Sequence, residues 1–154
     1  MFTDPFGLKP DTVEVIIWRS AGSGSSSAGH VSVRVNDRSY SMAPSGMDRR
    51  SFAEYRAKQG FREGMGMQLN VTAQQEKQIQ GALESDPGSY SLLSNNCTDP
   101  AQRAVEGTGV KLGSNLTPLG LANALIDAGV VSGVTEYPQL QPATGMTAPW
   151  GSSK

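Results

Sequence analysis

Apolar and polar residues alternate along several short stretches in the first half of the chain, a pattern that predicts β-strands. Residues 12–19 alternate and then become continuously apolar, and in residues 30–35 three valines alternate with polar side chains. Because the turn-like segment Asn36-Asp37-Arg38 separates this stretch from a return strand at 39–42, we expect a β-hairpin. Residues 64–71 alternate again. The pattern therefore predicts a small antiparallel sheet.

Helical patterns follow and interrupt these strands. Residues 51–58 and 72–84 each begin with Ser or Thr and carry Glu or Gln three residues later, which is the capping-box pattern of a helix start. A third helix is expected after residue 98, closed by the glycines at 107 and 109, and a fourth after Thr117. The fourth helix should turn its apolar side, Leu121, Leu125 and Ile126, towards the core. The expected fold class is α+β, with the sheet packed against helices.

The only cysteine, Cys97, lies between an apolar run at 90–93, which predicts a buried strand, and the third helix. A helix N-terminus carries partial positive charge and free N–H groups, so it favours the thiolate, which is the nucleophilic form. The only histidine, His30, opens the valine strand and lies on the face opposite the valines. We therefore predict that Cys97 is a nucleophile and His30 its base, the alternative being a buried structural cysteine and an ordinary histidine.

Two further residues are candidates for supporting roles. The hairpin brings Ser41 near His30, where a polar group can orient the imidazole. The backbone amide of Asn96 can help to hold an oxyanion beside the Cys97 amide, although Asn is equally typical of a turn or a helix cap.

Composition limits the classes of function. A chain of 154 residues with 37% hydrophobic residues suits one domain with a modest core. The net charge of −1 gives no basic footprint for nucleic acid, and no apolar run is long enough for a transmembrane helix. One cysteine excludes an intrachain disulfide, and one Cys with one His falls short of a usual zinc ligand set. We expect neither a cofactor nor a metal ion.

The N-terminal segment resembles a known signature. Asp4-Pro5-Phe6-Gly7-Leu8 is similar to the Asp-Pro-x-Gly-Leu motif that closes the core of Rhs-type polymorphic toxins. In that family a variable C-terminal toxin follows the motif and is released by cleavage just after the leucine. The resemblance implies a linker at 1–10 and a toxin domain at 11–136, the alternative for the motif being an ordinary Pro/Gly turn. The Pro/Gly-rich, polar composition of residues 137–154 predicts a tail that is extended or partly disordered.

A second resemblance concerns the order of the candidate residues. The segments Gly29-His30-Val31-Ser32-Val33 and Tyr90-Ser91-Leu92-Leu93-Ser94-Asn95-Asn96-Cys97-Thr98 are similar to those of circularly permuted papain-like hydrolases, in which the histidine precedes the cysteine. This group includes NlpC-type, PPPDE and lecithin retinol acyltransferase-like enzymes. The resemblance implies a permuted papain-like fold with the nucleophile at a helix N-terminus. A second histidine common in the acyltransferase branch is absent, which leaves Ser41 or a bare dyad, and Pro100 is an unusual residue after the cysteine.

Together the two resemblances imply an antibacterial effector acting as a cysteine peptidase or amidase. The alternatives are a lipid acyl hydrolase or acyltransferase, and a non-enzymatic interaction toxin with a papain-like shape. The implied partners are an Rhs carrier with its type VI secretion apparatus, a cognate immunity protein, and a protein or peptide substrate. Contact-dependent delivery into a target bacterium is expected, with action in its cytoplasm and the periplasm as the alternative.

Overall fold

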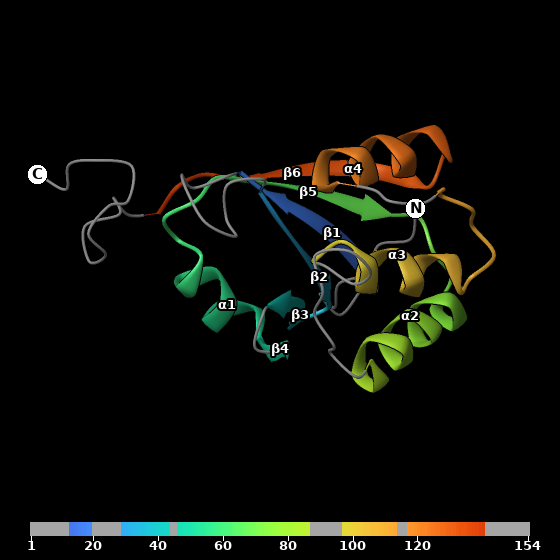
Figure 1. Ribbon diagram of the computed structural model, residues 1–154, viewed down its shortest axis with the longest axis horizontal. Coiled ribbons are helices and arrows are strands. Elements are labelled where there is room, and N and C mark those ends of the chain that lie inside the picture. The colour runs from blue at the N-terminus through green and yellow to red at the C-terminus, as the bar shows by residue number, and fades with distance from the viewer. Residues whose placement is uncertain (1–12, 20–28, 44–45, 87–96, 114–116, 141–154) are drawn as a thin grey trace, which may run out of the picture.

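The computed structural model describes residues 13–19, 29–43, 46–86, 97–113 and 117–140, and the statements below concern these ranges. They form a sheet with helices on both faces (Figure 1). The predicted apolar strand at 90–93 and the residue Asn96 lie outside the described residues, as does the Asp4–Leu8 motif.

The described strands form one antiparallel six-stranded sheet in the order β4-β3-β2-β1-β5-β6. They are β1 (Val13–Trp18), β2 (His30–Val35), β3 (Arg38–Ala43), β4 (Gly46–Ser51), β5 (Gly64–Leu69) and β6 (Val131–Tyr137). The expected hairpin is present as β2 and β3, and Asn36 in its turn has a positive φ of 53°, which Asn tolerates better than most residues. The predicted α+β class with an antiparallel sheet is confirmed.

Four helices occur in the described ranges: α1 (Phe52–Lys58), α2 (Ala73–Ser85), α3 (Asp99–Glu106) and α4 (Pro118–Asp127). Both predicted capping boxes are present, at Ser51 and at Thr72, and the Thr117 side chain caps α4. One prediction for α4 was wrong. Of the three residues predicted to face the core, Leu121 and Leu125 are buried, whereas Ile126 is 52% exposed.

Two edge strands were not predicted from the sequence. The strand β4 has the sequence Gly-Met-Asp-Arg-Arg-Ser, which lacks apolar alternation, and it is half-buried along almost its whole length. The strand β6 contains Gly133 and ends at Tyr137, the residue at which the predicted tail begins. Each of these strands pairs with one neighbour only. Hydrogen bonding to β3 or β5 explains why they are strands better than a buried apolar face does.

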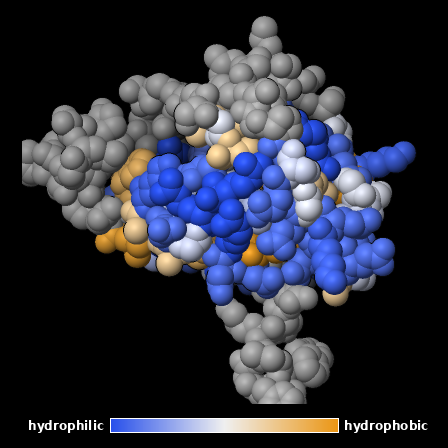
Figure 2. Space-filling view, turned by 90° about the horizontal axis from the view of Figure 1, so that it is seen from below, coloured by the Kyte–Doolittle hydropathy of each residue, from blue (hydrophilic) through white to orange (hydrophobic). Residues whose placement is uncertain are grey.

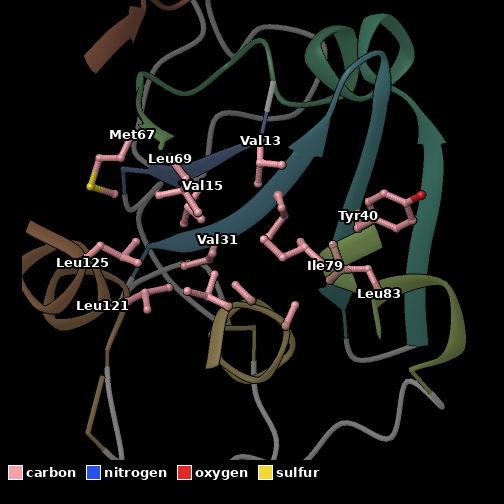
Figure 3. Close-up of a cluster of buried hydrophobic side chains, with 14 of the residues drawn as sticks. Val13, Val15, Val31, Tyr40, Met67, Leu69, Ile79, Leu83, Leu121 and Leu125 are labelled. Carbon is pink, nitrogen blue, oxygen red and sulfur yellow. The ribbon is translucent and has the colours of Figure 1, made fainter. Parts of the chain in front are cut away.

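The main core lies between the sheet and the helices α2, α3 and α4, a side that we call the helix face. Alternation places Val31, Val33 and Val35 on this face, as predicted. Figure 3 shows apolar side chains of β1 and β2 pointing into the space between α4 on one side and α2 on the other. In Figure 1, α2 and α3 lie side by side against this face.

The opposite side of the sheet, which we call the α1 face, holds a smaller core. Ile16 and Trp18 of β1 pack against Tyr55 of α1, with Phe52 and Tyr137 around them. Polar side chains accompany these rings: the Trp18 Nε1 donates a hydrogen bond to the Ser32 Oγ at 3.0 Å. This layer is therefore aromatic and hydrogen-bonded, whereas the helix face is aliphatic.

The arginines of residues 49–56 are used within the fold. Arg49 donates hydrogen bonds to the carbonyl oxygens of Leu83 and Asp86 at the end of α2, where helix carbonyls lack intrahelical partners. Arg50 pairs with Asp48 at 2.6 Å.

The surface seen from below Figure 1, on the side where α1 and α2 lie, is mostly hydrophilic (Figure 2).

Candidate active site

Cys97 lies in the turn that leads into α3. The helix begins at Asp99, with Thr98 as its N-cap residue and Pro100 in its first turn. Asp99 is therefore the first residue of the helix and not its cap. Since Ala101, Ala104 and Val105 of α3 belong to the main core, the packing of this helix fixes the turn on the helix face of the sheet.

The thiol of Cys97 is partly buried beside the start of β2. Burial raises its pKa above the usual value. Hydrogen bonds from the Val31 backbone, the Thr98 side chain and the amide of Cys97 itself act in the opposite direction, as does the positive charge of Arg62. The turn therefore places the sulfur against the backbone of the residue that follows His30.

His30 is the first residue of β2 and pairs with Trp18 of β1. It is partly buried, and burial is the main reason that its pKa falls from 6.5 to about 4. The cations Arg62 and Lys58 lower this pKa further, whereas Asp48 raises it. The imidazole is therefore neutral at neutral pH and is available as a proton acceptor.

The two shifts act against a preformed ion pair of thiolate and imidazolium. The pKa of Cys97 is raised and that of His30 is lowered, so both groups are uncharged near pH 7. A neutral imidazole can still remove the thiol proton while the sulfur attacks a carbon, which is general-base catalysis. The described surroundings favour that route over a resting thiolate.

The charge of Arg62 acts on both candidate groups. Its positive charge lowers the pKa of both His30 and Cys97. The side chain is only 6% exposed, and its Nη1 donates to the carbonyl oxygen of Arg19 at 3.4 Å. Burial lowers the pKa of Arg62 itself, and the nearby Tyr55 and Cys97 oppose this effect. No sequence pattern distinguishes Arg62, since its place near the site follows from the path of the chain between α1 and β5.

Ser41 of β3 lies on the same face of the sheet as His30 of β2, beside the position two residues after His30. It is the direct partner of Ser32, and both hydroxyls face the α1 face. The Ser32 and Ser41 hydroxyls lie near the Tyr55 hydroxyl and lower its pKa, although burial has the larger effect and raises it. The hairpin thus brings Ser41 into the polar layer that begins at His30.

A cavity of about 440 Å³ opens near the ends of β1, β5 and β6. Its walls are mainly apolar, and charged residues stand among them. The lining residues come from three strands, from the segments next to them and from the first turn of α4: Ile17, Arg19, Glu63, Gly64, Met65, Leu119, Glu136, Tyr137 and Pro138. No sequence pattern indicates this cavity, because its walls come from four separate parts of the chain.

No family model, curated protein or solved structure matches the chain. Within the described ranges, no group of three or more His, Cys, Asp or Glu side chains is placed to hold a metal ion. None of the helices in those ranges has the length and apolar character needed to cross a bilayer.

Proposed function

We propose that the protein is a cysteine hydrolase of amide or peptide bonds, with Cys97 as the nucleophile and His30 as the general base. One observation carries the proposal: the sulfur of the only cysteine hydrogen-bonds to the Val31 backbone, directly beside the only histidine. His30 belongs to the α1 face and the turn of Cys97 to the helix face, but both residues lie at the end of the sheet where β2 begins, and the charge of Arg62 acts on both. Two residues 67 positions apart in the sequence, both able to do acyl-transfer chemistry, are thus found at one end of β2.

In the first half of the proposed reaction, the imidazole of His30 takes the proton of the Cys97 thiol while the sulfur attacks the substrate carbonyl carbon. The new S–C bond pushes the carbonyl electron pair onto oxygen. The backbone N–H of Cys97 and the positive charge of Arg62 are suited to stabilise this oxyanion. As the oxyanion collapses, the C–N bond breaks and the imidazolium gives its proton to the leaving amine.

In the second half, water hydrolyses the thioester. His30 takes a proton from the water while the water oxygen attacks the same carbon, and the C–S bond then breaks. The imidazolium returns the proton to the sulfur, which restores the neutral pair. The low pKa of His30, about 4, keeps it unprotonated at neutral pH and ready to act as base in both halves.

The order of the elements supports a permuted papain-like assignment for this proposal. The strand that begins with His30 precedes the helix that follows Cys97, and β3, β4, α1, β5 and α2 come between them in the chain. The Asp4–Leu8 signature supports the biological setting, namely an Rhs-delivered antibacterial toxin with a cognate immunity protein. We place its target in the cytosol of the recipient cell.

The test is growth of a bacterium that expresses the full chain in its cytoplasm, as wild type, Cys97→Ala and His30→Ala. We expect the wild type to arrest growth and both variants to be harmless at equal protein levels. Ile126→Ala is a matched control, because this exposed side chain lies on the outer side of α4 and should leave toxicity unchanged.

The alternatives give different results. Equal toxicity of the wild type and Cys97→Ala would favour a non-enzymatic interaction toxin. If none of the chains is harmful, the same set is expressed behind a secretion signal, where toxicity of the wild type alone would move the target to the periplasm.

A further inference from the structure

One row of cross-strand partners connects the contact of Cys97 with the cavity. Val31 of β2 pairs with Ile17 of β1, Ile17 with Met65 of β5, and Met65 with Glu136 of β6. Direct partners project from the same side of a sheet, so these four residues share the helix face. Ile17, Met65 and Glu136 line the cavity, and the row ends at Val31, whose backbone contacts the Cys97 sulfur.

The row also gives the distance between the two places. Neighbouring strands are about 4.8 Å apart, so Met65 lies about 10 Å from Val31 across the sheet. An extended peptide rises about 3.3 Å per residue. A substrate whose scissile carbonyl lies at Cys97 therefore reaches the cavity with a side chain two or three residues away.

The lining of the cavity indicates an apolar guest. Ile17, Met65 and the exposed Leu119 supply aliphatic surface. A volume of about 440 Å³ is ample for a large side chain and lies in the range of small-ligand sites. Burial of such a side chain is favourable in proportion to the apolar area removed from water.

The charged residues of the cavity favour a peptide over a bilayer lipid. Arg19 and Glu63 form an ion pair at 3.0 Å, and Glu136 adds a second carboxylate. These residues carry a net negative charge. An anionic membrane surface attracts cationic segments and repels carboxylates. A soluble peptide meets no such repulsion.

We propose that this cavity is a specificity subsite of the Cys97 centre, and that it binds a large apolar side chain of a peptide substrate two or three residues from the bond cleaved. The inference rests on the proposed function, since it assigns a substrate class to the same site. The cavity and the nucleophile then bind two parts of one extended chain that runs along the end of the sheet at which β2 and β5 begin and β1 and β6 end.

The test compares two variants of α4. Leu119→Glu places a charge in the lining of the cavity, and Ile126→Glu places the same charge on the same helix away from it. Both side chains are exposed, 63% for Leu119 and 52% for Ile126, so neither substitution removes core packing. Equal thermal unfolding of the two variants would show that the fold is retained.

The probes are tripeptidyl chloromethyl ketones that carry either Phe or Ala at the second or the third residue from the reactive group. The Cys97 sulfur displaces chloride: a C–S bond forms, the C–Cl bond breaks, chloride leaves, and the thiol proton passes to His30. Mass spectrometry measures the rate of labelling. We expect at least one Phe probe to react about 10-fold faster than its Ala counterpart with the wild type and with Ile126→Glu, but less than about 2-fold faster with Leu119→Glu.

The outcomes separate the inference from the function on which it rests. If no peptide labels Cys97 faster than iodoacetamide does, the proposed function fails and the subsite with it. If Phe and Ala probes react equally and Leu119→Glu changes nothing, the subsite is wrong while the hydrolase stands. If a palmitoyl chloromethyl ketone labels Cys97 faster than the Phe probes and Leu119→Glu slows it, the guest is an acyl chain and the peptide assignment is overturned.

Discussion

The carboxylate of Glu14 fills the space in which a side chain at Gly66 would lie. Glu14 is 1% exposed, and a Cβ atom added to Gly66 would collide with its Oε2 oxygen and carboxyl carbon. The other carboxylate oxygen accepts a hydrogen bond of 2.6 Å from the Tyr137 hydroxyl. Arg34 lies 3.9 Å from the same oxygen. The absence of a side chain at Gly66 in β5 thus makes room for the buried carboxylate of Glu14 in β1. This carboxylate connects Tyr137 of β6 and Arg34 of β2 with the centre of the sheet.

Gly66→Ala should destabilise the protein by about 1–3 kcal/mol, because the added methyl group forces Glu14 to move in a packed interior. Urea unfolding followed by fluorescence measures the free energy of unfolding. Gly81→Ala in α2 is the matched control. No atom lies within 4 Å of the place of its added Cβ, and Ala is the better helix former, so we expect a stability unchanged or raised by up to about 1 kcal/mol. Equal effects of both changes would contradict the role assigned to Glu14.

Tyr137→Phe should cost about 1.5–3 kcal/mol of unfolding free energy, since it removes a hydrogen bond to a buried carboxylate. The ring contacts with Trp18 and Phe52 remain, so the loss isolates the hydroxyl. In the double variant with Glu14→Gln, the effect of Tyr137→Phe should shrink. A double-mutant cycle with purely additive values would show that the two groups do not interact.

His30 should make the stability depend on pH. Its pKa is about 4 in the folded protein and about 6.5 when exposed, so the unfolded chain binds the proton more readily between these values. The contribution of His30 to the free energy of unfolding is fully present above pH 6.5. It is lost as the pH falls to 4, by at most about 3 kcal/mol. Urea unfolding from pH 4 to 7 should show a smaller decline for His30→Gln than for the wild type. Parallel curves would show that burial does not depress this pKa.

Arg62→Gln should raise two pKa values at once. The variant loses a cation that disfavours imidazolium at His30 and one that favours thiolate at Cys97. Since the chain has one histidine and one cysteine, NMR titration of the imidazole and the pH profile of iodoacetamide labelling each report a single group. Lys77→Gln, an exposed change in α2, serves as the control and should move neither. A change in only one of the two profiles would show that Arg62 does not face both groups.

The local pattern of the sequence determined most of the elements. Alternation identified β1, β2, β3 and β5, and side-chain capping signals located the starts of α1, α2 and α4. These features depend on a few neighbouring residues, so they can be read without the rest of the fold. The sequence also singled out Cys97 and His30, because each is the only residue of its kind.

The tertiary structure decided what those elements meet. The strands β4 and β6 carry no clear pattern of their own and form because β3 and β5 offer hydrogen-bonding edges. The charge of Arg62 near both candidate groups, the fit of Glu14 against Gly66 and the cavity beside Ile17 depend on residues brought together from distant parts of the chain. The same holds for the protonation of the site. A helix start alone predicts a stabilised thiolate, but burial, which only the packed structure sets, leaves both the thiol of Cys97 and the imidazole of His30 neutral.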